Sequence, residues 1–220
     1  MKIKMDRKLA VAGATINLAG VIAFAGTMLT GSLSASYISS IFIAWGLVIM
    51  NSGFFRFGRA DARVAALCAV VFAGMYAVCN SVVYFVQITT VANDALSAQA
   101  MSVLDYRSFG LMFNLDMLGY CLMAVSTFFA GLTIAVRDKG DRCLKVLLLI
   151  HGIFAVSCFL LPMLGLFHAG MEGADRIGTA VLEFWCVYFI PVGILSIRYF
   201  RHQVSGNAKR YSNKKNAIQS

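Results

Sequence analysis

The stretch RFGRADARVAALCAVVFAGMYAVCNSVVYFVQI, residues 56–88, decides the fold of this chain. Three arginines lie in its first turn, and the run from Val64 to Ile88 that follows contains no charged residue. That run is longer than the roughly 20 residues with which a helix crosses a hydrocarbon core of about 30 Å. Because a segment in lipid must satisfy its own backbone hydrogen bonds, the run predicts a transmembrane helix.

Apolar runs of this kind recur from one end of the chain to the other. The six predicted spans are residues 9–28, 38–55, 64–88, 109–136, 143–167 and 177–199. Hydrophobic residues make up 60% of the chain and charged residues 13%, whereas a soluble domain is about half apolar and a quarter charged. An outer-membrane barrel would show short alternating strands instead. We therefore expect an all-α bundle of six transmembrane helices in residues 1–200, followed by a basic, disordered cytoplasmic tail in residues 201–220.

The basic residues predict how the bundle is oriented. Lys and Arg cluster at the N-terminus, in every second gap between the spans and in the tail. Of the 19 basic residues, only Arg107 and Arg176 fall in the other gaps. Because short loops rich in Lys and Arg stay in the cytoplasm, we expect a multi-pass protein of the cytoplasmic (inner) membrane with both termini inside.

The net charge of +9 would suggest a nucleic-acid partner in a soluble protein. Here the charge lies at helix ends, so we expect contact with anionic lipid headgroups at the cytoplasmic face and no nucleic acid. The tail from Arg198 to Lys215 contains basic residues and no acidic one. Its composition favours a partly disordered, lipid-contacting terminus over a dedicated partner site.

Only two acidic residues lie within the predicted spans, Asp116 in the fourth and Glu183 in the sixth. A charged side chain at the centre of a membrane helix costs roughly 2.5–3.5 kcal/mol on insertion scales, so both require an explanation. At about 1.5 Å per residue, the two acids lie at comparable depth in the outer half of the membrane. Asn80 of the third span lies at the same level.

Helical spacing extends this polar level into a predicted site. On the third span, one face carries Tyr76, Asn80, Tyr84 and Gln87. Two carboxylates near one another suit a cationic ligand or a shared proton, so we expect an outward-facing pocket. The residues expected to line it are Asp116, Glu183, Asn80, Tyr84, Tyr120, Asn114, Trp185 and His168.

A purely structural role is the alternative for both acids. A protonated Asp116 bonded to Asn80 or Tyr84, and a Glu183 bonded to a neighbouring helix, would only join helices. We favour the shared site, because two acids at one depth are harder to explain as independent bonds.

The one long connection joins the third and fourth spans. Asn93 and Asp94 are good helix-start residues, and apolar residues follow them at helical spacing up to Leu104. We expect a short amphipathic helix resting on the outer surface. A lid over the pocket is the alternative.

Small residues and prolines predict how the helices pack. Ala69 and Ala73 are four residues apart and allow close approach of backbones, which places the third span inside the bundle. Asn51 is expected to be a packing residue. Pro162 and Pro191 lie inside the fifth and sixth spans, and each should bend its helix.

No cofactor or metal ion is expected. His151 lies within the fifth span, but a haem or metal site would need a second strong ligand at the same depth, so we expect an interior histidine satisfied by hydrogen bonds. The motifs G-x-x-x-x-G-K-[ST], H-E-x-x-H and G-x-S-x-G do not occur.

Three segments carry a resemblance: FNLDMLGY (residues 113–120), FFAG (128–131) and LLLIHG (147–152). With them the chain resembles a group of uncharacterised bacterial six-helix membrane proteins, which implies the fold and brings no established activity. The layout of six helices with internal termini and Ala10-x-x-x-Ala14 is also similar to substrate-capture subunits of energy-coupling-factor vitamin transporters. This second likeness is one of architecture, without their ligand-binding signature.

These features favour an integral membrane protein that binds a small solute or cation in an outward-facing pocket and takes part in its transport. The alternative is a non-transporting interaction protein, such as a sensor, an immunity factor or an accessory subunit, whose helix faces bind a membrane-protein partner. An integral membrane enzyme ranks third.

Overall fold

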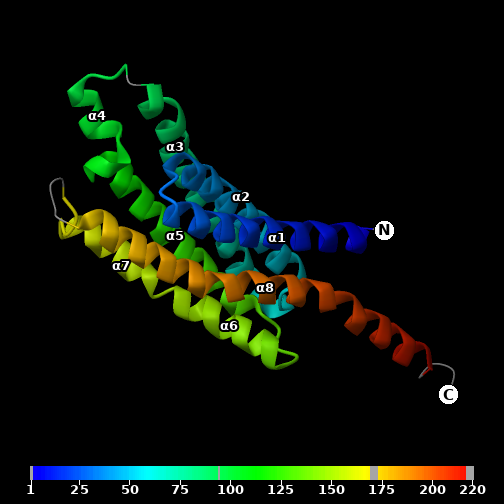
Figure 1. The fold of residues 1–220 in the computed structure, drawn as a ribbon. Coiled ribbons are helices and arrows are strands. Elements are labelled where there is room, and N and C mark those ends of the chain that lie inside the picture. Colours follow the sequence, from blue (N-terminus) through cyan, green and yellow to red (C-terminus); the bar gives the residue numbers. More distant parts are fainter. Residues whose placement is uncertain (1, 94, 169–172, 217–220) are drawn as a thin grey trace.

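The structure is a computed structural model that describes residues 2–93, 95–168 and 173–216. Its regular elements in these ranges are all helical (Figure 1). The α-helices are α1 (Lys2–Leu29), α2 (Leu33–Phe57), α3 (Arg63–Thr89), α4 (Ala98–Leu104), α5 (Leu111–Thr133), α6 (Lys139–His151), α7 (Phe154–Met163) and α8 (Ala174–Asn216). Short 3₁₀ turns lie in the connections at Ala60–Ala62, Val91–Asn93 and Tyr106–Ser108.

Six helical segments of the described chain are long and apolar enough to cross a membrane. They are Lys4–Leu29, Leu33–Phe57, Ala60–Asn93, Leu111–Thr133, Lys139–Met163 and Arg176–Gln203. The predicted all-α architecture with six spans is therefore confirmed. The two chain ends lie at one end of the bundle, and α4 lies at the opposite end (Figure 1).

The helices α1 and α2 form a hairpin with closely packed backbones. A Cβ atom on Gly46 would lie 2.5 Å from the backbone nitrogen of Asn17, so a side chain has no room there. Asn17 is fully buried and donates a 2.9 Å hydrogen bond from Nδ2 to the carbonyl of Ile43. Because this bond crosses between the helices, a polar group inside the bundle holds the hairpin together.

Asn51 joins α2, α3 and α5. Its Nδ2 donates to Oγ of Ser126 at 2.6 Å and to the carbonyl of Ala69 at 3.3 Å. Ser126 donates to the same carbonyl at 2.8 Å. Ala69 and Ala73 are both fully buried, which confirms that the third span packs inside the bundle through small residues.

The short helix predicted between the third and fourth spans is present as α4, with a different start from the predicted one. It begins after Ser97, whose side chain accepts a 3.2 Å hydrogen bond from the backbone nitrogen of Ala100. The prediction of a start at Asn93 is wrong because that residue belongs to a separate 3₁₀ turn. Asp94, the other expected start residue, lies outside the described residues.

The fifth span departs from the predicted single helix, because it is split into α6 and α7 at Gly152. The backbone nitrogen of Gly152 bonds the carbonyl of Leu149 at 3.1 Å, so the chain tightens locally into a 3₁₀-type turn. A Cβ atom on Gly152 would lie 2.8 Å from Cβ of Phe128 on α5. Close contact with α5 therefore accompanies the break, which lies well before Pro162.

The last helix runs beyond the membrane span. The structure describes α8 as helical up to Asn216. The disordered tail expected in residues 201–220 stays a prediction, and residues 217–220 lie outside the described residues. Residues 201–216 contain no proline and several good helix formers, which is compatible with a continued helix. Pro191 lies inside α8 without ending it.

Side chains at the end that carries both termini connect the last helix to the end of α2 and to the loop between α5 and α6. The Tyr199 hydroxyl donates to the carbonyl of Phe57 at 3.2 Å, and the Arg137 guanidinium lies 4.7 Å from the centre of the Tyr199 ring. Asp138 pairs with Arg198 at 2.7 Å. Backbone N–H donors at the start of α6, together with the Arg198 guanidinium, hold the pKa of Asp138 below its usual value.

Candidate functional site

One face of α3 and one face of α5 meet inside the bundle. The predicted polar face of α3 is confirmed, since each of its four residues is at most 4% exposed, namely Gln87, Tyr84, Tyr76 and Asn80. The helices approach closely at this level, because a Cβ atom on Gly119 would lie 3.2 Å from Cβ of Cys79. The polar side chains of α3 are therefore enclosed by α5 instead of facing lipid.

Asp116 on α5 is fully buried, and only one of its two carboxyl oxygens accepts a hydrogen bond of ordinary length from a described residue. Its Oδ2 accepts a 2.9 Å hydrogen bond from the hydroxyl of Tyr84. The same hydroxyl lies 3.2 Å from the hydroxyl of Tyr120, one turn further along α5. The second carboxyl oxygen, Oδ1, has no hydrogen-bond partner among the described residues. The site therefore holds a buried acid with one free acceptor.

Asn80 adds a second free acceptor to this cluster. Its side chain is fully buried, and Nδ2 makes a long hydrogen bond of 3.4 Å to the hydroxyl of Tyr76. Its Oδ1 has no partner in the described part of the chain. Tyr76 in turn packs against Tyr120, with ring centres 6.2 Å apart. Asn80 and Asp116 thus belong to one aromatic cluster.

Two tyrosines outside the predicted set cover this cluster at the end of the bundle where α4 lies. Tyr37 of α2 stacks on Tyr84 with ring centres 5.1 Å apart. Tyr106 of the loop between α3 and α5 lies 6.2 Å from Tyr84 and 5.5 Å from Phe113 by the same measure. Burial, and then the nearby charge of Asp116, raises the pKa of Tyr106 well above its usual value.

Gln87 binds the loop between α3 and α5 and holds it over the site. Its Nε2 donates to the carbonyl of Leu104 at 2.8 Å, and its Oε1 accepts from the backbone nitrogen of Tyr106 at 3.0 Å. A single side chain of α3 thereby satisfies two backbone groups of the loop. These two hydrogen bonds hold the loop over the site, as a lid would be held. A helix that rests freely on the surface would not require them.

The loop joins α5 through a residue in an unusual conformation. Phe109 has φ 52° and ψ 28°, the left-handed region that bulky residues rarely adopt. Its ring packs on Phe113 at 5.0 Å and on Phe167 at 5.9 Å between ring centres. These contacts hold the strained backbone in place, at the junction where the loop would have to move to open the site.

Three other predicted site residues, Glu183, Asn114 and His168, are less buried than Asp116. Glu183 is half-buried on α8, and within the described chain no hydrogen bond or ion pair joins it to Asp116. Its Oε1 also lacks a described partner, and the convergence of the two acids stays a prediction. Asn114 is exposed on α5, two residues from the inward-facing Asp116, and His168 is exposed after α7.

Trp185 packs on Tyr120 of the first cluster, with ring centres 6.4 Å apart, and joins it to a second buried cluster around His151. The indole Nε1 donates to Nε2 of His151 at 2.9 Å, and Nδ1 of the imidazole lies 2.7 Å from Oγ1 of Thr127. Because an indole nitrogen can only donate, Nε2 must accept, and the proton of the neutral ring lies on Nδ1. The Thr127 hydroxyl accepts from Nδ1 and in turn donates a 2.9 Å hydrogen bond to the carbonyl of Ala124. The prediction of a satisfied interior histidine is confirmed.

The chemistry of the first cluster suits a small cation. A carboxylate and an amide oxygen are ligands for hard cations, and tyrosine ring faces attract ammonium groups. Among the described residues, no group of three or more His, Cys, Asp or Glu side chains is placed to hold a metal ion. Asp116 and Asn80 have no exposed surface, so a ligand reaches them only when the covering residues move.

Comparisons with known proteins add no assignment, since no protein-family model, curated protein or solved structure matches this chain. The contacts of the chain's own residues therefore carry the functional argument.

Proposed function

We propose that this chain is a multi-pass protein of the cytoplasmic membrane that binds a small cation or cationic solute from the outside and takes part in its transport. The proposed binding site is the cluster of Asp116, Asn80, Tyr84 and Tyr120. The distribution of basic residues supports an orientation with both termini inside. In that orientation α4 and the loop over Asp116 face outward (Figure 1).

One observation carries the proposal: the free acceptors Oδ1 of Asp116 and Oδ1 of Asn80, both on fully buried side chains of one cluster. A buried polar group without a partner costs about 1–3 kcal/mol. The amide oxygens Oδ1 of Asn17 and Asn51 also lack a described partner, so the feature specific to this cluster is a free carboxyl oxygen in the same cluster as a free amide oxygen. A cation held between α3 and α5 would compensate both oxygens.

The cover over the site fits a binding step that excludes water. The Gln87 bonds to the loop and the Tyr37–Tyr84 stack close the outer end. Loops that close over a bound group shield it from water and must open again to release it. Because the sequence has no ATP-binding motif, an ion gradient or a partner protein would supply energy for transport.

Infrared difference spectroscopy on the purified protein in lipid tests the proposal directly. Choline in the buffer is exchanged for sodium, potassium or tetramethylammonium, and separately acidic buffer is exchanged for alkaline buffer. We expect at least one exchange to change the carbonyl stretch of a buried carboxyl group. That signal should vanish in Asp116→Asn and persist in the control Asp61→Asn, whose carboxylate is exposed at the other end of the bundle.

The variant Glu183→Gln decides whether the two acids share the site. If they do, removing Glu183 should shift the Asp116 band, because interacting carboxylates titrate as a coupled pair. A spectrum in which no exchange changes any band that depends on Asp116 would contradict cation binding. The cluster would then have a structural role, and the interaction-protein alternative would gain support.

A further inference from the structure

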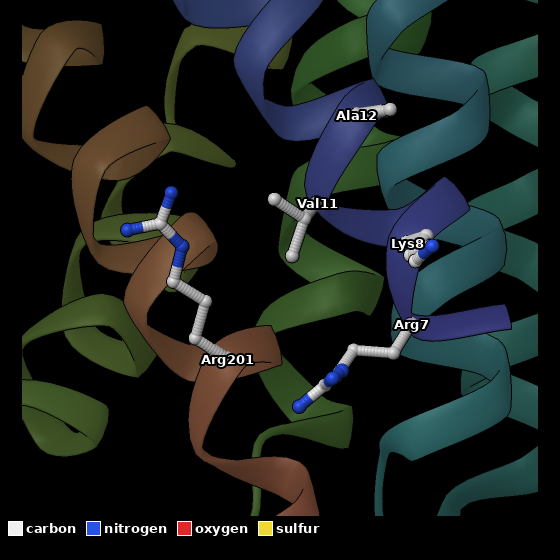
Figure 2. A pocket seen from close by; sticks show the side chains of 5 residues that line it. All are labelled: Arg7, Lys8, Val11, Ala12 and Arg201. Carbon is white, nitrogen blue, oxygen red and sulfur yellow. The ribbon is translucent and has the colours of Figure 1, made fainter. Parts of the chain in front are cut away.

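A shallow depression lies between α1 and α8 near the end of the bundle that carries both termini. It has a volume of about 370 Å³ and is lined by Arg7, Lys8, Val11, Ala12 and Arg201. Figure 2 shows Arg7 and Val11 reaching from α1 toward the gap, with Arg201 on α8 across from them. We call these five residues the basic seat.

The basic seat concentrates positive charge without an acid. In the described part of the chain, no ion pair involves Arg7, Lys8 or Arg201. The neighbouring Asp6 is not available, since it pairs with Arg56 at 2.8 Å. Cations that face one another without an acid repel, and a bound anion would remove that repulsion.

The other acids at this end of the bundle are also engaged. Asp138 pairs with Arg198, and Asp141 pairs with Arg137, both at 2.7 Å. The acids therefore neutralise other arginines and leave those of the basic seat unpaired. Guanidinium groups bind phosphate oxygens in a bidentate manner, so phosphate is the anion that this arrangement suits best.

The apolar half of the basic seat indicates what carries the phosphate. Val11 and Ala12 stand one turn further into the span Lys4–Leu29 than the two basic residues of α1. Arg201 lies near the end of the span Arg176–Gln203. Positive charge at the level of the headgroups with apolar side chains directly below matches a phospholipid, whose phosphate is followed by its glycerol and acyl chains. A soluble phosphate would gain nothing from the apolar residues.

We propose that the basic seat binds the phosphate group of one anionic phospholipid, at the membrane surface that carries both chain termini. The lipid bridges α1 and α8, the first and last spans, which pack against each other. Basic pockets between transmembrane helices are a known means of headgroup recognition. This lipid site is independent of the cation site, which lies in the opposite half of the bundle.

Native mass spectrometry tests the proposal. The full chain is reconstituted in vesicles of phosphatidylcholine and phosphatidylglycerol, extracted in mild detergent, and analysed for retained lipid. We expect one phosphatidylglycerol to be retained in preference to phosphatidylcholine. The double variant Arg7→Gln/Arg201→Gln should reduce that retention about tenfold or more, because each basic residue near the surface contributes to anionic-lipid binding.

The double variant Lys139→Gln/Arg142→Gln is the matched control. It removes the same charge at the same end of the bundle, from exposed side chains at the start of α6. Retention should be unchanged in this control. Equal retention in all proteins would overturn the proposal, and so would equal loss in the control, because net charge and not the seat would then hold the lipid.

Two further measurements distinguish lipid binding from misfolding of the variants and from binding of a soluble anion. Ala12 is exposed, so Ala12→Glu should fold normally. It leaves all three basic residues in place and should still abolish retention of the lipid, because it places an acid in the basic seat. Inorganic phosphate should not displace the retained lipid. Displacement by phosphate at equal concentration, or full retention in Ala12→Glu, would overturn the lipid assignment.

Discussion

Tyr84 donates a 2.9 Å hydrogen bond to Oδ2 of Asp116, and its hydroxyl lies 3.2 Å from the hydroxyl of Tyr120. The Tyr106 hydroxyl also interacts with this carboxyl. Tyr84 lies on α3 and both of its partners lie on α5, so the interaction joins the two helices. A helix-joining role would be complete if the carboxyl had a second donor. Because Oδ1 has no donor, the helix-joining role accounts for one carboxyl oxygen of Asp116 and not for the other.

Replacing Tyr84 by Phe should destabilise the bundle. The substitution keeps the ring and removes the hydroxyl that donates to Oδ2 of Asp116 at 2.9 Å, which leaves the Tyr106 hydroxyl as the remaining donor near this buried carboxyl. Loss of a partner for a buried polar group costs about 1–3 kcal/mol. The measurement is reversible unfolding in detergent.

Tyr76→Phe is the control for this prediction. It removes the same hydroxyl from the same face of α3, but its bond to Asn80 is long, at 3.4 Å, so the loss should be smaller. Equal stability of wild type and Tyr84→Phe would show that the carboxyl finds another donor in the membrane.

The hydrogen-bond chain at His151 predicts a single tautomer. Because Trp185 can only donate to Nε2, the imidazole should be neutral and carry its proton on Nδ1. Nitrogen NMR of protein labelled at histidine distinguishes the two tautomers. Detection of the proton on Nε2, or of a charged ring at neutral pH, would contradict the arrangement of Trp185, His151 and Thr127.

Thr127→Val tests the same chain by stability. The substitution preserves the shape of the side chain and leaves the Nδ1 proton of His151 without its acceptor, at a cost of about 1–3 kcal/mol. Thr127→Ser keeps the hydroxyl and should be much closer to wild type. The two unfolding midpoints would coincide only if the hydroxyl had no role.

Sequence predicted the spans and the polar face of α3 because both follow from counting residues. Apolar length sets which segments cross the membrane, and a period near 3.6 sets which residues share a face. Asn80, Tyr84 and Gln87 therefore appear inside the bundle as expected. Depth is also countable, which is why Asp116 and Glu183 could be placed at one level.

The rotation of one helix relative to another does not follow from counting. It is set by packing, and the structure turns Asp116 into the bundle while Glu183 is only half-buried. Tyr37 and Tyr106 escaped prediction for a similar reason: they reach the site from a different helix and from a loop with no period. The break at Gly152 depends on contact with Phe128, which lies in another span.

Cysteine labelling in intact cells tests the orientation. After replacement of the native cysteines, Ala95→Cys in the outer loop should react with an impermeant maleimide, and Ala60→Cys between α2 and α3 should react only after permeabilisation. Both positions are exposed. We expect this pattern because the loop between α2 and α3 is basic, and basic loops stay in the cytoplasm. The reverse labelling pattern would overturn the orientation, and with it the outward-facing site.

Replacing Gln87 by Leu should loosen the cover over Asp116. The substitution removes the bonds to Leu104 and to the amide of Tyr106 while keeping a side chain of similar size. Loss of about 1.4 kcal/mol of local stability corresponds to a tenfold change in an equilibrium. Hydrogen exchange followed by mass spectrometry should therefore show the Tyr106 amide exchanging about tenfold faster or more.

The control for this prediction is Gln99→Leu, the same chemical change at an exposed position of α4. It should leave exchange at Tyr106 unchanged. If Gln87 fastens the cover, Gln87→Leu should also speed the exchange of the Asp116 infrared signal with added cations. Unaltered exchange at Tyr106 in Gln87→Leu would mean that the ring contacts with Tyr84 and Phe113 alone hold the loop.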